Sequence, residues 1–231
     1  MLTLLGQILL EPIVENGGFS PDFVESEKKN LISTIESELN NKQAYCAARL
    51  MENMCKADSF GIPRLGRPEE VAAITPQSLY SHYQRILRES RVELFYVGAR
   101  EPEEVYGLLK NLFAGVDRQY VPLQPQTPFH DGGESHLTEE MNITQSKLSM
   151  GYVTEITNRT PEFAAMQLLN NVFGGGMTSK LFMNIREKLS LCYSIGTSYS
   201  GTKGIVTLSA GIDADQEETV RREVARLLED C

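Results

Sequence analysis

The sequence predicts an α+β fold, built from long amphipathic helices and from several short strands. Stretches in the first half of the chain carry apolar residues at three- and four-residue intervals, which is the period of a helix. The second half contains short extended runs bounded by turn residues, a pattern typical of strands. A stretch rich in proline, glutamine and glycine separates the two halves. These three observations together indicate helices packed with a sheet and a linker between two regions of the chain.

The first elements along the chain are predicted to be two helices. Leu5, Ile8, Leu9 and Ile13 fit one face of a helix that ends near Gly17 and Gly18. Ser20 and the proline after it then open a long helix that runs into the fifties, with apolar residues on one side and charges between them. Its pattern is interrupted at residues 40–41, which is either a kink or a break.

Shorter elements follow before the linker. Residues 59–67 read as a loop, and Pro68 begins a short helix because proline is tolerated in a first helical turn. Thr75 caps a helix over residues 77–89. Residues 91–98 are rich in β-branched and aromatic side chains and predict a strand, and a helix is expected over 103–113.

The second half is predicted to alternate between strands and helices. Residues 119–133 form the linker, which is semi-rigid where proline is dense. The expected strands are 135–141, 147–153, 191–199 and 204–212. The expected helices are 163–173, 180–188 and 215–229. Gly174, Gly175 and Gly176 end the first of these helices, and we expect them to turn the backbone through positive φ.

Composition limits the classes of partner. The chain has 231 residues and a formal net charge of −9, which argues against nucleic acid or anionic lipid as its main partner. Its four cysteines form no Cys-x-x-Cys pair, so reduced thiols in a cytoplasmic protein are the simplest expectation. No run approaches the length of a transmembrane helix, and the first residues lack the basic leader of a signal peptide.

Two polar residues stand out beside the glycines. Arg186 lies near the end of the second glycine-flanked helix, and Tyr193 follows seven residues later in the next strand. A guanidinium and a phenol at this spacing can converge on one acceptor, such as a substrate carbonyl. The alternative is that Arg186 pairs with a local carboxylate while Tyr193 fills the core. A phosphate cradle at the glycines is a weaker alternative, because the Gly-Lys-Ser/Thr of a P-loop is missing.

The residues from 170 to 193 carry a resemblance to a known family. The glycine triplet, a small polar pair, Leu-Phe, Arg-Glu-Lys and Leu-x-Tyr-Ser resemble the C-terminal half of the insulinase-like (M16) zinc peptidases, which include pitrilysin and the mitochondrial processing peptidase. The resemblance implies an antiparallel sheet with helices packed on one face. It also implies that Arg186 and Tyr193 grip substrate backbone, with Gly174, Gly175 and Gly176 beside them.

The resemblance also implies a domain organisation. Residues 1–118 resemble the later half of the family's first repeat, and residues 134–231 resemble the earlier half of the second repeat. The expectation is therefore a middle piece of a longer, bacterial protein.

The family's zinc motif is missing from this chain. His-x-x-Glu-His occurs nowhere in it, and the resemblance places Thr34, a poor zinc ligand, where the family has its third ligand. A register shift of two residues would instead make Glu36 that ligand. His82 is expected to be a partly buried helix residue. His130 and His136 lie near acidic residues at the linker, where only adventitious metal binding is expected.

These features predict a non-catalytic homologue of the M16 peptidases. Its expected ligand is a peptide or unfolded polypeptide, and its expected partner is a zinc-bearing M16-type subunit, in a hetero- or homodimer. Zinc is expected only in that partner or in an upstream part of the protein. The alternatives are a structural assembly subunit without substrate contact, or an active zinc endopeptidase whose metal motif lies upstream.

Overall fold

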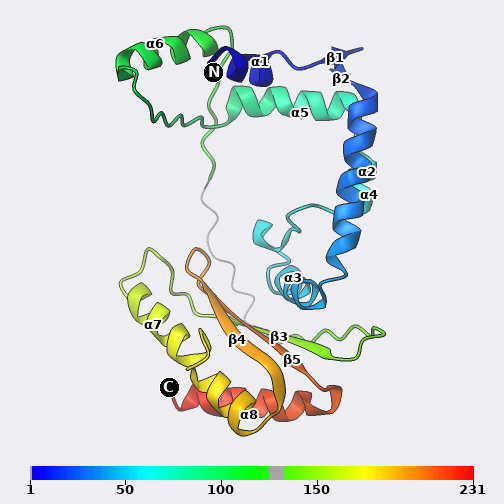
Figure 1. Ribbon diagram of the computed structural model, residues 1–231, viewed down its shortest axis with the longest axis vertical. Helices are drawn as coiled ribbons and strands as arrows, with labels where there is room; N and C mark the ends of the chain where they lie inside the picture. Colours follow the sequence, from blue (N-terminus) through cyan, green and yellow to red (C-terminus); the bar gives the residue numbers. More distant parts are fainter. Residues whose placement is uncertain (1, 125–132) are drawn as a thin grey trace. The chain divides into compact units, whose positions relative to one another are not determined.

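The computed structural model describes residues 2–124 and 133–231, which form two compact units (Figure 1). The first unit comprises Met1–Ile35 and Leu65–Pro125, and the second comprises Glu36–Arg64 and Gln126–Cys231. Residues 36–64 therefore belong with the second unit, although they precede much of the first in sequence. The repeat boundaries at residues 118 and 134 stay a prediction.

The first unit is mostly helical. Its elements are α1 (Leu2–Leu10), β1 (Val14–Glu15), β2 (Gly18–Phe19), α2 (Pro21–Glu38, which continues into the second unit), α4 (Pro68–Ala72), α5 (Pro76–Glu89) and α6 (Pro102–Phe113). Thr75 caps α5 as predicted, since its hydroxyl accepts a hydrogen bond from the backbone N–H of Ser78 at 3.1 Å. Each of the last three helices has proline in its first turn.

The prediction that the first helix reaches Gly17 is wrong. The helix ends at Leu10, and the chain then forms the small antiparallel hairpin of β1 and β2. Asn16 and Gly17 form its turn with φ values of 51° and 77°. Positive φ at both central residues is the requirement of a type I′ turn, for which Asn-Gly is a preferred pair.

Two predicted strands do not form in the part of the chain that the structure describes. Residues 91–98 belong to no sheet, and residues 135–141 likewise pair with no strand. High β-propensity is not sufficient, because a strand exists only when a second strand satisfies its backbone groups.

The second unit contains the sheet (Figure 1). Strands β3 (Ser146–Val153), β5 (Ile205–Ile212) and β4 (Cys192–Ser200) lie in the order β3-β5-β4, and both pairings are antiparallel. The helical elements of this unit are α3 (Lys42–Met54), η1 (Ser59–Gly61), α7 (Phe163–Phe173), η2 (Phe182–Lys188), η3 (Ala214–Gln216) and α8 (Glu217–Glu229). The α+β class and the antiparallel sheet are confirmed.

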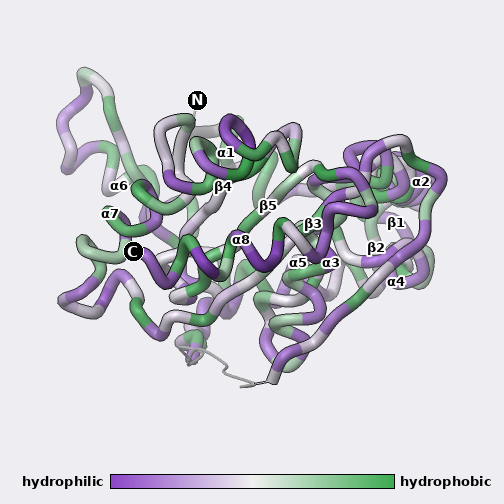
Figure 2. Tube along the Cα trace, turned by 90° about the horizontal axis from the view of Figure 1, so that it is seen from below, coloured by the Kyte–Doolittle hydropathy of each residue, from purple (hydrophilic) through white to green (hydrophobic). Residues whose placement is uncertain are grey.

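The core of the second unit lies between the sheet and α8. Leu208 and Ala210 of β5 point to the same face, and Val220, Val224 and Leu227 follow one side of α8. Figure 2 shows hydrophilic and hydrophobic residues alternating along α8, as expected for an amphipathic helix. The complete buried cluster is Phe173, Leu181, Ile185, Cys192, Ile195, Leu208, Ala210, Ile212, Val220, Val224 and Leu227.

A further helix, α3, packs against β3 and β5. It lies on the opposite side of the sheet from α8 (Figure 1). The interruption at residues 40–41 is a break: α2 ends at Glu38, and the Asn41 side chain caps α3 by accepting a hydrogen bond from the backbone N–H of Ala44 at 3.1 Å. Within the described residues, no helix has both the length and the apolar character needed to cross a bilayer.

Candidate functional site

Arg186 lies on an irregular helix. Residues Phe182–Lys188 form a π-helix, in which the Leu189 N–H donates to the Asn184 carbonyl, five residues earlier, at 3.0 Å. Ile185 anchors the segment in the core and is fully buried, so its neighbour Arg186 is directed outward. π-Helical turns are uncommon, and they occur frequently at functional sites.

Tyr193 lies at an irregularity in β4. Cys192 is opposite Ile212 and Ser194 is opposite Gly211, so Tyr193 is the extra residue of a β-bulge. Cys192 and Ile195 are both buried although they are three positions apart, an odd spacing that would place them on opposite faces of a regular strand. The bulge therefore leaves Tyr193 and Ser194 together on the face of the strand opposite the core.

The two irregular elements bring Arg186 against the backbone of Tyr193. The Arg186 Nε–H donates to the Tyr193 carbonyl oxygen at 3.2 Å, and the guanidinium lies 4.9 Å from the centroid of the Phe182 ring. The guanidinium also forms an ion pair with Glu187. The Tyr193 phenol donates to Asp213 Oδ1 at 3.4 Å.

Both side chains remain accessible to solvent. Tyr193 is 61% exposed and the Arg186 side chain is 41% exposed. The alternative that Tyr193 fills the core is therefore wrong, whereas the pairing of Arg186 with a local carboxylate is observed. Sequence reasoning missed Glu187 and Asp213 as partners. The adjacency of Glu187 to Arg186 was the available signal for the first, and only the sheet register brings Asp213 near Tyr193.

Gly174 and Gly175 act through close packing, and none of the three glycines has a positive φ. Gly174 has φ −150°, and the glycines with positive φ in the described chain are Gly17, Gly66 and Gly204, so that expectation is wrong. A Cβ at Gly174 would lie 2.5 Å from Thr197 Oγ1. The Gly174 carbonyl accepts a hydrogen bond from the Thr197 N–H at 2.9 Å, which attaches the turn to the outer edge of β4.

The other two glycines differ from Gly174 in their surroundings. A Cβ at Gly175 would lie 2.7 Å from the Cα of Asn171, so this position is also closely packed. A Cβ at Gly176 would meet nothing within 4 Å.

A shallow hollow of about 330 Å³ lies on the sheet in the second unit. Ser194 and Gly196 of β4, Thr207 and Ser209 of β5, and Gln43 of α3 contribute to its lining. Its side chains are small or uncharged, and a backbone can approach such a surface closely. Ser194, which follows Tyr193 in the bulge, lines the hollow, whereas Arg186 and Tyr193 do not.

Burial affects the thiol next to Tyr193. Burial raises the pKa of Cys192, and the nearby Arg186 charge opposes this only in part. The thiol therefore stays protonated at neutral pH, and a protonated thiol is a weak nucleophile.

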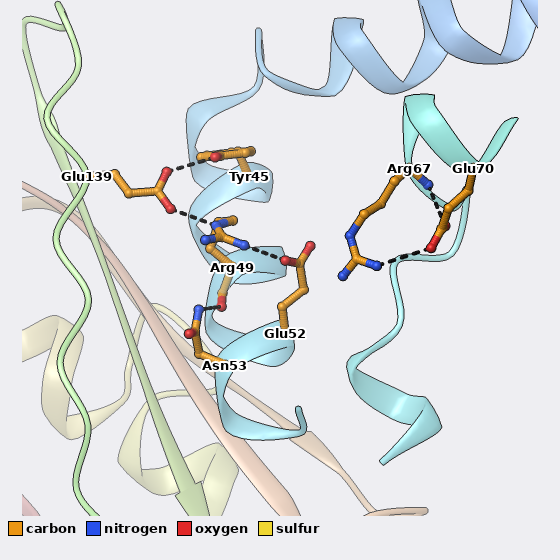
Figure 3. Close-up of polar contacts among 7 residues, drawn as sticks. All are labelled: Tyr45, Arg49, Glu52, Asn53, Arg67, Glu70 and Glu139. Carbon is orange, nitrogen blue, oxygen red and sulfur yellow. Dashed lines mark hydrogen bonds and ion pairs between the residues drawn. The ribbon is translucent and has the colours of Figure 1, made fainter. Parts of the chain in front are cut away.

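A second polar cluster fixes the extended residues after the linker to α3 (Figure 3). Glu139 accepts hydrogen bonds from Arg49 Nε at 2.7 Å and from the Tyr45 hydroxyl at 2.8 Å, and Arg49 is also paired with Glu52. The hydrogen bond from Arg49, followed by that from Tyr45, lowers the pKa of Glu139. The hydrogen bond to Glu139 raises the pKa of Tyr45. The cluster has the character of a structural clasp.

The candidate metal ligands do not gather. The described residues contain no group of three or more His, Cys, Asp or Glu side chains that could hold a metal ion. Thr34 donates to the Asn30 carbonyl at 2.8 Å, and Glu36 is exposed on the same helix. His82 is exposed, with its Nδ1 2.9 Å from Arg85, so the expectation of partial burial is wrong.

The linker histidines are only partly described. His136 Nε2 lies 3.2 Å from a guanidinium nitrogen of Arg221. His130 lies outside the described residues.

Comparison with known proteins identifies the family. The profile described as "Peptidase M16 inactive domain" matches residues 73–230. The "Probable inactive metalloprotease YmfF" of Bacillus subtilis is 30% identical over 217 residues, which are 94% of this chain and 51% of the relative. The chain therefore belongs to the M16 peptidase family.

Solved structures agree on the fold. A conserved protein of Enterococcus faecalis has 30% identity and a TM-score of 0.91, covering 99% of this chain and 54% of that one. A peptidase M16 inactive domain of Pseudomonas fluorescens, at 17% identity and a TM-score of 0.75, covers 99% of this chain and 55% of that one and supports the fold alone. The chain spans about half the length of the curated relatives it matches.

Proposed function

We propose that this chain is a non-catalytic M16-type subunit that binds an extended peptide or unfolded polypeptide through Arg186 and Tyr193. The observation that carries the proposal is the coincidence of two irregularities: a π-helix carries Arg186, a β-bulge carries Tyr193, and a 3.2 Å hydrogen bond joins them. Both irregularities cost regular hydrogen bonding, so their meeting at two exposed polar residues favours a role in binding.

The chemistry of the pair suits peptide carbonyls. The guanidinium and the phenol hydroxyl are hydrogen-bond donors, and a peptide carbonyl is an acceptor. The hollow beside Ser194 offers small, uncharged side chains over which an extended backbone can lie. In this proposal Gly174 keeps the turn close to β4, Gly175 packs against Asn171 of α7, and Gly176 leaves space beside them. Beside a zinc-bearing M16-type subunit, the two donors orient the peptide for cleavage by that partner.

A titration with fluorescently labelled unstructured peptides tests the proposal. Arg186→Ala and Tyr193→Phe are each expected to weaken binding about tenfold, because each removes a donor worth about 1–2 kcal/mol. Arg226→Ala is the matched control, since Arg226 is an exposed, carboxylate-paired arginine on α8. With a zinc-bearing M16 subunit present, turnover is expected to fall by a similar factor.

A structural assembly role is the second candidate. The pairing of Arg186 with Glu187, and of Tyr193 with Asp213, favours it, because both donors already have acceptors within the chain. In that case the two variants would bind peptide as wild type does, while Glu187→Gln would lower the stability of the unit.

A further inference from the structure

The tip of the β1–β2 hairpin carries the only Asn-Gly pair in the sequence, Asn16 and Gly17. Both residues are exposed, and a Cβ at Gly17 would meet nothing within 4 Å. Every other asparagine of the chain is followed by a residue that carries a side chain. In a two-residue turn the closing hydrogen bond joins the flanking residues, so the Gly17 N–H is not needed for it. The tip therefore combines an accessible side-chain amide with an unobstructed backbone nitrogen.

These two groups can react with each other. The Gly17 nitrogen, after losing its proton, bonds to Asn16 Cγ, and the Cγ–Nδ2 bond breaks. The departing nitrogen takes up a proton and leaves as ammonia, and a five-membered succinimide remains. One water molecule then opens this ring at either of its two carbonyls. Opening at Cγ gives aspartate, and opening at the main-chain carbonyl gives isoaspartate, whose backbone contains one additional methylene group.

The hairpin controls access to this reaction. Asn16 and Gly17 have φ values of 51° and 77°, as a type I′ turn requires. Closing the succinimide ring requires rotation about the Asn16 Cα–C bond away from that turn. The hairpin has only two residue pairs, Val14 with Phe19 and Glu15 with Gly18, and so short a pairing is marginal by itself.

The second strand of the hairpin is held by α5. The Phe19 ring centroid lies 5.2 Å from that of Tyr80 and 5.6 Å from that of Tyr83. A Cβ at Gly18 would lie 2.7 Å from the carbonyl carbon of Pro76, so the backbone is also closely packed there. Val14 and Glu15 of the first strand are exposed. The hairpin therefore opens by release of β1 and the tip, unless the contacts of Phe19 are lost.

We propose that Asn16 is a site of spontaneous modification, at which conversion to isoaspartate opens the β1–β2 hairpin. The additional methylene lengthens the two-residue turn, so Glu15 and Gly18 no longer pair in register. The new carboxylate also lies next to Glu15, and like charges at adjoining positions of a hairpin repel. The modification accumulates with time, and it is independent of the role of Arg186 and Tyr193.

Peptide mapping by mass spectrometry after incubation at mildly alkaline pH tests the site. The peptide that contains Asn16 is expected to gain the mass of one amide-to-acid conversion and to contain isoaspartate as well as aspartate. The peptide that contains Asn40 is the internal control, because Asn40 is exposed but precedes Asn41. It should stay unmodified over the same time. Gly17→Ala should abolish the modification at Asn16, because its methyl group obstructs the attacking nitrogen.

A second variant tests the control by the hairpin. Phe19→Ala removes both ring contacts with α5, so the hairpin should open more often and the modification should accelerate at least about fivefold. Tyr106→Ala is the matched control, since Tyr106 on α6 is 68% exposed, and it should keep the wild-type rate. Circular dichroism in the far ultraviolet verifies that both variants retain the helix content of the wild type.

The structural consequence is tested on the purified isoaspartate form. It should lose the near-ultraviolet circular dichroism of the Phe19, Tyr80 and Tyr83 cluster. Asn16→Asp has the same charge without the additional methylene, and Asp-Gly also suits a type I′ turn, so this variant should keep the signal.

Three results would overturn the proposal. The first is an Asn16 peptide that is modified no faster than the Asn40 peptide. The second is a Phe19→Ala variant that is folded and modified at the wild-type rate. The third is an isoaspartate form with the same aromatic signal as Asn16→Asp.

Discussion

The two units of this protein contain similar proportions of apolar sequence but bury very different cores. In the second unit, eleven buried residues from the sheet, α7, η2 and α8 form one cluster. In the first unit, the buried apolar side chains among the described residues are Val24, Val71 and Val105. The difference lies in the sheet: helices of the second unit cover paired strands, whereas the candidate strand of the first unit has no partner. In this chain the larger core forms where helices cover paired strands, and apolar content alone does not produce it.

Truncation of a core side chain is the strongest test of this difference. Leu208 is fully buried in β5, so Leu208→Ala is expected to lower the free energy of unfolding of the second unit by about 2–5 kcal/mol. Leu108→Ala, on α6 of the first unit, should cost less than about 1 kcal/mol because that side chain is 42% exposed. Urea denaturation measures both, and equal losses would contradict the comparison.

The two units also differ in how deeply they bury the carboxylate that pairs with a largely buried lysine. Lys203 is 13% exposed and pairs with Asp58, which is 4% exposed, whereas Lys28 pairs with the mostly exposed Glu25. Lys203→Met should cost about 2–3 kcal/mol, because it leaves a buried carboxylate without its partner. Lys28→Met should cost less, about 1–2 kcal/mol, since Glu25 remains hydrated and the Ile74 carbonyl loses one hydrogen bond of 3.0 Å. Similar losses in the free energy of unfolding for Lys203→Met and Lys28→Met would contradict the greater burial of the Lys203–Asp58 pair.

Two glycines test how tightly each unit is packed. Gly174→Ala is expected to destabilise the second unit by about 1–3 kcal/mol, because its Cβ would meet Thr197 and Leu181 within 3 Å. A Cβ at Gly6 in α1 would meet only the movable end of Leu112. Gly6→Ala should therefore be neutral or slightly stabilising in its helix. A destabilised Gly6→Ala would mean that the first unit is as rigid as the second, and thermal unfolding distinguishes these outcomes.

Acid should weaken the cluster of Glu139 with Arg49 and Tyr45. It should leave the Arg67–Glu70 ion pair unchanged. The hydrogen bond from Arg49, then that from Tyr45, lowers the pKa of Glu139, so this stabilisation is present above the unfolded pKa. It is lost as the pH falls through the lower, folded value. Proteolysis of residues 133–140 is therefore expected to accelerate in acid, and Glu139→Gln should remove that pH dependence.

Glu70→Gln is the control for the clasp. Glu70 pairs with Arg67, three residues away in the first unit, and both side chains are about half exposed (Figure 3). This variant should retain the wild-type pH dependence at residues 133–140. A rate of proteolysis at residues 133–140 that does not change with pH in the wild type would contradict the account of Glu139.

Sequence reasoning succeeded where the signal was local. Apolar spacing predicted α5, α7 and α8, and Thr75 with its following proline identified the start of α5. The strand signals of β3, β4 and β5 were also sufficient, because those strands have partners within the chain. The Asn16-Gly17 turn was equally readable, but the helical pattern before it was extended too far.

The remaining features depend on distant parts of the chain. The bulge at Tyr193 follows from the register against β5, and the packing of Gly174 follows from Thr197. The segment 91–98 has the composition of a strand, but composition does not provide a partner. The family resemblance directed attention to Arg186 and Tyr193, whereas their contacts with Glu187 and Asp213 required the fold.

The peptide-binding role of the Arg186–Tyr193 pair is tested most directly by a double-mutant cycle. Peptide affinity would be measured for the wild type, Arg186→Ala, Tyr193→Phe and the double variant. If both donors hold one peptide segment, the losses are expected to be non-additive, with an interaction energy of about 0.5–3 kcal/mol. Four proteins with the same affinity would contradict the account.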